Sequence, residues 1–301
     1  MNKNQYIIYI YNKKNMLVPE EISLLVSSDP SQGAVNVNPQ GNAFEIQLDE
    51  EIAIPKDALN VHVSVEEATV WWTVPNILTG VNDTFYIFGD AAGGGTQLFT
   101  IQIQQGLYDL TGLNNSLQSE LEAAGARTVD GLGNPLPLVS LSPDDATQKV
   151  LLRFNYPNVT VDFTPANTPR EILGFDALLY GPFVGAPLNI LAPNVAAFNQ
   201  VNYFLIASDL VQKGIRFNNR YNQVITQVLI NVAPGSQIVS TPFNPAKINA
   251  QELAGSKRTN IRFRLTDDKL RPVDTNNEYF SLRLVIRYLR PMAIAKSVGY
   301  Y

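Results

Sequence analysis

The chain has 301 residues, of which 45% are apolar and 16% are charged, and its formal net charge at pH 7 is −5. This composition excludes wholesale disorder, and a charged fraction below the usual value of about 25% indicates that partners cover much of the surface. Cysteine is absent, so neither disulfides nor thiolate metal sites hold the fold. No apolar run reaches the roughly 18 residues that a membrane-spanning helix needs.

The N-terminal stretch MNKNQYIIYIYNKKN has an apolar run that is too short for a signal peptide, and no small-residue cleavage site follows it. We therefore interpret it as part of the mature protein. Interfacial tyrosines beside basic residues are typical of segments that lie on a membrane surface. The alternative is an extended arm that adds a strand to a neighbouring subunit, and both interpretations stay open. The candidate contact residues are Lys3, Tyr6, Tyr9, Tyr11, Lys13 and Lys14.

From Glu21 onward, short apolar or alternating runs are separated by Gly, Pro, Asn and Asp, a pattern that indicates an all-β sandwich or barrel. The first half has eight expected strands, at residues 21–28, 43–54, 60–74, 83–90, 98–104, 138–142, 149–155 and 159–163. The second half has six, at residues 187–192, 201–208, 222–233, 236–241, 259–267 and 279–289. In the last two strands, apolar side chains alternate with arginines, as in an antiparallel sheet with one buried face.

One helix is expected within the first half, at residues 109–125. Its leucines recur at three- and four-residue spacing, and Gly125 is a natural helix stop. The helix follows the fifth expected strand. A segment rich in Pro and Gly, residues 168–187, is expected to join this first β unit to a second one.

The residues that could carry chemistry do not form a catalytic set. The single histidine, His62, is expected to be exposed on the polar face of its strand, and no motif supplies the orienting partners that a catalytic base needs. Carboxylates at residues 49–51, 144–145 and 267–268 are interpreted as solvated strand ends, with hard cations between subunits as the alternative. The glycine-rich stretch 89–97 lacks the lysine and the following helix of a phosphate loop. We expect no enzyme activity, no cofactor and no metal.

The charge is distributed unevenly along the chain. Residues 1–19 carry +3, residues 20–165 carry −15 and residues 166–301 carry +7. Such a split favours either a nucleic-acid face or attraction between an acidic half and the basic half of a neighbouring copy. The candidates on the basic side of such a junction are Arg216, Arg220, Arg262, Arg264, Arg283 and Arg287.

Several stretches resemble capsid proteins of tailless icosahedral viruses in the adenovirus-hexon lineage. They are EEATVWWTVPNI followed by DTFYIF, then FTIQIQQGLYDLTGLNNSLQSEL, and later REILGF. The resemblance covers roughly residues 43–175. The matching positions are Trp72, Pro75, Asn76, Ile77, Ile103, Gly106, Tyr108, Leu110, Leu113, Leu117, Leu173, Gly174 and Phe175.

The resemblance implies an all-β chain with two jelly-roll β-barrels in tandem and one helix inserted in the first. The implied segments are an N-terminal arm (1–19), a first jelly roll (20–165), a linker (166–179), a second jelly roll (180–292) and a C-terminal tail (293–301). The implied function is that of a major capsid protein of the virion. Homotrimers with six barrels in a ring would tile an icosahedral shell over an internal membrane, as in the lipid-containing Flavobacterium phage type.

The implied partners are other copies of the chain, penton and minor capsid proteins and the viral membrane, with no sequence-specific binding of nucleic acid. Two alternatives remain. One is a single-jelly-roll vertex (penton) protein or minor capsid protein with an appended β domain, and the other is a carbohydrate-binding β-sandwich.

The only two tryptophans, Trp71 and Trp72, are adjacent on one expected strand, so their rings are expected to point to opposite faces. We expect one ring in the barrel core and the other against a neighbouring barrel or subunit, where a large aromatic side chain is a good anchor. Both residues are therefore candidates for an interface.

Overall fold

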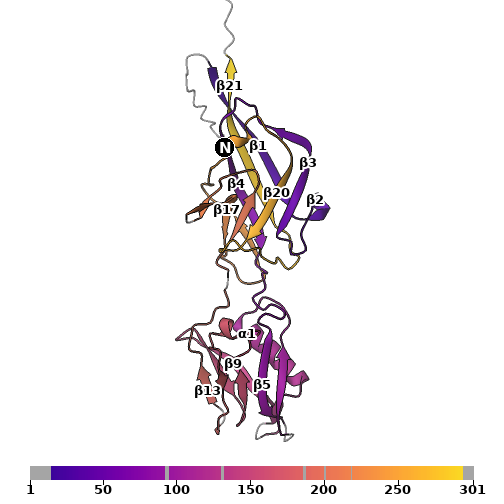
Figure 1. Cartoon of the computed structure of the whole chain (residues 1–301), viewed down its shortest axis with the longest axis vertical. Coiled ribbons are helices and arrows are strands. Elements are labelled where there is room, and N and C mark those ends of the chain that lie inside the picture. Colours follow the sequence, from indigo (N-terminus) through magenta and orange to yellow (C-terminus); the bar gives the residue numbers. More distant parts are fainter. Residues whose placement is uncertain are drawn as a thin grey trace, which may run out of the picture. The chain divides into compact units, whose positions relative to one another are not determined.

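A computed structural model describes residues 15–91, 95–129, 132–185, 188–199, 201–217 and 219–293, and it confirms the all-β class (Figure 1). The chain divides into two compact units. Unit 1 consists of the residues up to 72 together with those from 201 onward, and unit 2 consists of residues 73–200. Unit 1 is thus assembled from both ends of the sequence, and unit 2 is an insertion within it.

The described part of unit 1 is built from two five-stranded antiparallel sheets, with a short two-stranded hairpin beside them. The first sheet has the order β1-β21-β4-β18, with β19 also paired to β4, and the second has the order β17-β14-β20-β3-β2. The strands of the first sheet are β1 (Asn15–Ser27), β4 (Leu59–Trp71), β18 (Gln237–Ser240), β19 (Ile248–Asn249) and β21 (Ser281–Ala293). Those of the second are β2 (Ala34–Val35), β3 (Ala43–Ala53), β14 (Tyr203–Ser208), β17 (Val224–Leu229) and β20 (Lys257–Thr266).

The strand order of unit 1 is that of a single jelly roll. Its eight main strands in chain order are β1, β3, β4, β14, β17, β18, β20 and β21. The first sheet contains the first, eighth, third and sixth of them, and the second sheet contains the second, seventh, fourth and fifth. Two sheets connected in this way form the double Greek key of a jelly roll.

The expected division into two tandem jelly rolls, at residues 20–165 and 180–292, differs from this arrangement. The first strand pairs with the last along its whole length, with Leu24 opposite Leu284. The third strand pairs with the last as well, with Val65 opposite Leu284. The two ends of the chain therefore share one sheet, and they cannot belong to separate barrels.

Alternation of side chains explains why these segments form a sandwich. In β20, Ile261, Phe263 and Leu265 are buried, and Arg262 and Arg264 are exposed, as expected. Phe263 stacks on Phe44 of β3, with ring centroids 5.2 Å apart. The alternation thus supplies one apolar face that the opposite sheet covers.

Unit 2 contains three further sheets. Their orders are β12-β11-β5-β6, β13-β10-β9 and β7-β8. The strands are β5 (Thr84–Asp90), β6 (Thr96–Gln102), β7 (Arg127–Val129), β8 (Pro135–Pro137), β9 (Val139–Asp144), β10 (Lys149–Phe154), β11 (Thr160–Asp162), β12 (Leu179–Tyr180) and β13 (Leu188–Leu191). β13 was expected to open a second barrel, but it pairs with β10, with Ile190 opposite Leu152.

The expected helix of unit 2 is confirmed as α1 (Leu110–Ala123). It begins at Asp109, whose side chain accepts a hydrogen bond from the backbone N–H of Gly112. It buries Leu113, Leu117 and Leu121 completely. The short α2 (Arg170–Leu173) ends at Gly174, and 3-10 turns lie in unit 1 at η1 (Pro30–Gln32) and η2 (Gln251–Leu253). Among the described residues, no helix is both long enough and apolar enough to span a membrane.

Two of the sequence motifs meet in unit 2. The side chain of Asn76 accepts a hydrogen bond from the backbone N–H of Tyr108 at 2.9 Å and donates one to the carbonyl of Tyr108 at 2.8 Å. Ile77 forms a β-bridge with Gly106. The stretches around Pro75 and Gly106 therefore hold the entry to α1 in place, which is a structural role.

Candidate subunit interface

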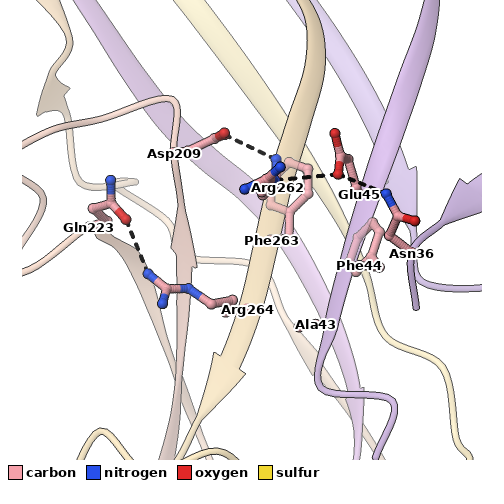
Figure 2. A pocket seen from close by; sticks show the side chains of 9 residues that line it. All are labelled: Asn36, Ala43, Phe44, Glu45, Asp209, Gln223, Arg262, Phe263 and Arg264. Atoms are coloured by element: carbon pink, nitrogen blue, oxygen red, sulfur yellow. Dashed lines mark hydrogen bonds and ion pairs between the residues drawn. The ribbon is translucent and has the colours of Figure 1, made fainter. Parts of the chain in front are cut away.

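A groove of about 600 Å³ lies on the second sheet of unit 1 (Figure 2). Its polar lining consists of Asn36, Glu45, Asp209, Gln223, Arg262 and Arg264. The two arginines belong to the polar face of β20, and Glu45 lies directly opposite Arg262 in the neighbouring β3. The groove is therefore formed by the outward side chains of the same strands that bury Phe44 and Phe263 in the core.

Glu45 is the most enclosed charged group in the groove. Its side chain is only 8% exposed, and its Oε2 lies 3.3 Å from Nε of Arg262. A hydrogen bond from Asn36 lowers the pKa of Glu45; burial opposes this, and the nearby charge of Arg262 lowers the pKa further. The carboxylate thus stays ionised to a lower pH than an ordinary glutamate.

The remaining polar groups of the groove are held by neighbours in unit 1. Nη2 of Arg264 donates a hydrogen bond to Oε1 of Gln223 at 3.1 Å, and the backbone N–H of Arg262 donates one to Asp209 at 3.0 Å. The guanidinium of Arg262 remains largely exposed, at 71% of the side chain. Within the described ranges, no cluster of three or more His, Asp or Glu could hold a metal ion. This arrangement can bind and orient polar groups of another molecule.

A second polar surface lies on the outer face of the first sheet. Arg287 donates hydrogen bonds to Glu66 at 2.5 Å and to Ser64 at 3.0 Å, and it pairs with Glu21 at 3.1 Å. Burial lowers the pKa of Arg287, but the hydrogen bonds and charges of Glu66 and Glu21 outweigh this and raise it. The guanidinium is therefore fixed among its partners.

Beside this cluster lies a large exposed apolar side chain. Leu25 of β1 is 80% exposed and stands opposite Arg283, which pairs with Glu66 at 3.7 Å. Leu25 is therefore an exposed apolar side chain beside ordered polar groups on the outer face of the first sheet.

The charge asymmetry of the sequence has an explanation within unit 1. Six ion pairs of the described residues join an acid among residues 20–66 to a base among residues 257–290. The acidic early strands and the basic late strands lie side by side in one jelly roll, so their attraction acts within the chain.

The net charge of each unit also differs from the split along the sequence. Unit 1 has 18 bases and 16 acids (+2), and unit 2 has 4 bases and 11 acids (−7). The expected junction between an acidic and a basic barrel is thus not required to explain the split.

The two tryptophans take different positions. Trp72 is 3% exposed and packs edge-on against Phe204, with ring centroids 6.0 Å apart. Trp71 is half-buried at the end of β4, opposite Gln237 of β18. The expectation of one ring in the core is confirmed, and Trp72 as an interface residue is wrong because the core covers it. Trp71 stays a predicted interface residue.

The expected arginines do not form one surface. Arg262 and Arg264 line the groove, whereas Arg283 and Arg287 lie on the first sheet. The other two, Arg216 and Arg220, belong to the short hairpin of β15 (Arg216–Phe217) and β16 (Arg220–Tyr221). There Arg216 and Lys213 lie 5.7 and 5.9 Å from the ring centroid of Tyr221, which is 58% exposed. The six arm candidates, from Lys3 to Lys14, lie outside the described residues.

His62 is less exposed than expected. It shares the outward face of β4 with Ser64 and Glu66, but it is half-buried. Its Nδ1 lies 3.0 Å from the carbonyl oxygen of Asn60, and its Nε2 is covered, with no hydrogen-bond partner among the described residues. Neighbouring strands on both sides of β4 enclose the ring, which strand alternation alone does not reveal.

No protein-family model and no curated protein sequence matches this chain. Solved structures that are similar to it include the crystal structure of the penton protein of mavirus. The two chains share 13% sequence identity, and the TM-score is 0.47. The match covers 90% of this chain and 100% of the mavirus chain.

Because the pKa of Glu45 lies below the usual 4.5, its ionised form stabilises unit 1 above that pH. We expect the free energy of unfolding to fall as the pH drops from about 4.5 through the lower pKa of the folded protein. Glu45→Gln should flatten this dependence in urea titrations at a series of pH values. Glu51→Gln is the control, because Glu51 belongs to an exposed pair with Lys257 that contributes little. Equal acid profiles for wild type and Glu45→Gln would refute the assignment.

Proposed function

We propose that this protein is a structural capsid protein of a virion and that it forms pentamers at the vertices of an icosahedral shell. The observation that carries the proposal is the strand order of unit 1, a complete eight-stranded jelly roll. Jelly rolls are used by viral capsid proteins, by lectins and by cupins. The sequence resemblance to capsid proteins favours the first of these classes.

The interior of the jelly roll supports a scaffold role. Its buried side chains are mainly apolar, with Phe44, Phe263 and Phe280 in contact at centroid distances of 5.2 Å. The described core of unit 1 is filled by packed aromatic and aliphatic groups. This core stabilises a rigid shape that other copies can contact.

The number of jelly rolls per chain favours the vertex position. The major-capsid alternative requires two jelly rolls in each chain, so that three copies place six barrels around a ring. One jelly roll with an inserted domain corresponds to the vertex alternative, in which each copy contributes one barrel around a fivefold axis. The exposed Leu25 and its polar surroundings on the first sheet then supply a contact surface between neighbours.

The native mass of the purified protein tests this proposal. We expect an assembly of five times the 33.2 kDa chain mass, with fivefold symmetry in electron micrographs. Leu25→Asp should yield monomers, because burying a charge in an apolar contact is unfavourable. Leu132→Asp is the matched control, because Leu132 is 88% exposed in unit 2 and lies outside the proposed contact. Trimers would contradict the proposal and favour the major-capsid alternative. A monomer that binds glycans would favour the carbohydrate-binding sandwich.

A further inference from the structure

The loop between β18 and β19, residues 241–247, carries a fully exposed aromatic side chain. Phe243 is 105% exposed, the highest value among the described large apolar side chains. Prolines at positions 242 and 245 restrict the backbone around it. The strands at both ends of the loop are paired with β4. The phenyl ring is therefore held out into solvent on a stiff support.

The same loop carries a positive charge and no negative one. Lys247 is exposed, and among the described residues it takes part in no ion pair. A stiff loop loses little conformational entropy when it binds, so more of its interaction energy appears as affinity. The loop thus presents an apolar anchor and, four residues later, a cation.

Unit 2 contains a pocket of about 350 Å³ that is lined mainly by apolar side chains. Leu110 of α1, Val150 of β10, and Val195 and Phe198 of the segment after β13 belong to this lining. Val195 is 57% exposed, so the pocket opens to the surface. A cavity of about 150 Å³ lined by apolar side chains can bind benzene, and this pocket therefore has room for a phenyl ring.

The polar part of the lining is acidic. Asp144 and Asp145 both line the pocket, and the exposed Asp145 pairs with no base in the part of the chain that the structure describes. The basic side chain of the lining, Lys149, donates a hydrogen bond to the carbonyl of Pro193 at 2.7 Å. The pocket therefore offers a negative charge beside an apolar floor.

We infer that Phe243 of one copy occupies the unit 2 pocket of a second copy, with Lys247 beside Asp145. The occupant is a second copy because one chain carries both surfaces, and they match in size, polarity and charge. Such a contact joins two different surfaces, so it is head-to-tail and generates a ring or a filament. The inference rests on the proposed function for the closure of that ring at five copies, and it adds a contact to the surface around Leu25.

Sedimentation equilibrium of full-length variants tests the contact. Phe243→Ala removes the anchor and should weaken association about thirtyfold or more, as for an aromatic residue at the centre of an interface. Val195→Trp fills the pocket, and the exposure of Val195 lets the fold tolerate the change. The matched controls are Leu229→Ala in unit 1 and Val184→Trp in unit 2, at side chains that are 61% and 94% exposed. Both controls should associate like wild type.

A mixture of the two defective variants gives the sharpest result. The Val195→Trp chain keeps its loop and the Phe243→Ala chain keeps its pocket, so each can make one contact. We expect 1:1 pairs with twice the 33.2 kDa chain mass and no larger assembly. Single variants that associate like wild type, or a mixture that forms no pairs although wild type associates, would overturn the inference and leave the pentamer proposal standing.

Reversal of the two charges tests the orientation of the loop. Lys247→Asp and Asp145→Lys should each weaken association by about fivefold, because each places like charges together at an exposed position. The double variant should recover the association of wild type, since opposite charges then face each other again. Additive losses in the double variant would contradict the pairing of these two residues.

Photo-crosslinking separates this contact from the pentamer. Benzoylphenylalanine incorporated at position 243 should link to residues 143–150 or 195–199, and a mixture of isotope-labelled and unlabelled protein should show by mass spectrometry that the link joins two copies. Such links in a protein that forms no pentamers would support the contact and refute only the pentamer. Links within one chain, or links to other parts of a second copy, would overturn the inference.

Discussion

Replacing Trp72 with alanine is expected to lower the free energy of unfolding of unit 1 by about 3–5 kcal/mol, the range for removing a large buried aromatic side chain. Trp72 is 3% exposed and contacts Phe204, so its removal leaves a cavity between the third and fourth main strands. Its backbone bonds to Ser236 and Gly235 are retained, so the loss reports on the side chain. Urea denaturation followed by far-ultraviolet circular dichroism measures the effect.

The adjacent tryptophan provides the control. Trp71→Ala removes the same ring from the opposite face of the same strand, where it is half-buried. We expect a cost of about 1 kcal/mol or less, in keeping with changes outside the core, together with weaker assembly. If Trp71→Ala destabilises the monomer as strongly as Trp72→Ala, the two faces of β4 are assigned incorrectly.

Gly174→Ala is expected to destabilise unit 2 by about 3 kcal/mol. Gly174 ends α2 with φ at +79°, where an L-residue costs about 1–2 kcal/mol. An added Cβ would also lie 2.3 Å from the carbonyl oxygen of Asn194, so the backbone must move, which adds strain comparable to that of an overpacked core. Scanning calorimetry should show a lower transition temperature for unit 2.

A second glycine separates these two costs. Gly125 follows α1 with φ at +70°, and an added Cβ there has no heavy atom within 4 Å. Gly125→Ala should therefore cost only the left-handed conformation, about 1 kcal/mol. The transition of unit 1 should stay in place in both variants, because distant sites act independently. A shift of all transitions together would show that the two units unfold as one.

Local features of the sequence predicted local structure well. The spacing of Leu113, Leu117 and Leu121 gave the helix, and the alternation around Phe263 gave the face of β20 that carries the arginines. Both patterns depend on residues only a few positions apart. The spacing of the apolar residues and the helix-capping residues therefore indicate the local structure directly. The all-β class follows from the same kind of signal.

The pairing of strands could not be predicted in the same way. Alternation shows that one face of β4 is buried, but it does not show that β21, more than 200 residues later, lies beside it. A tandem of two barrels and one barrel with an insertion have nearly the same local pattern. Moreover, the sequence resemblance covers residues 43–175 and so extends across the boundary at residue 72. It therefore did not indicate that the insertion, unit 2, begins there.

The enclosed carboxylate of the groove was missed for a related reason. Glu45 follows Phe44 and precedes Ile46 in an alternating strand, which marks it as outward-facing and no more. Its low exposure comes from Asn36 and from Arg262, which is 217 positions away in the sequence. The arginine was identified as a candidate, but its partner lies in the same chain and not in a neighbouring copy.

Because unit 1 is formed by two separate stretches of the sequence, its strands are synthesised at different times, before and after unit 2. Among the described strands, β1 pairs only with β21, which lies more than 250 residues later in the chain. At about 5–20 residues per second, β1 waits on the order of tens of seconds for that partner. Unit 2 is continuous in sequence and is complete well before then. The first sheet closes only after β21 has been synthesised, so a chain that terminates before β21 contains a complete unit 2 but leaves β1 without its partner strand.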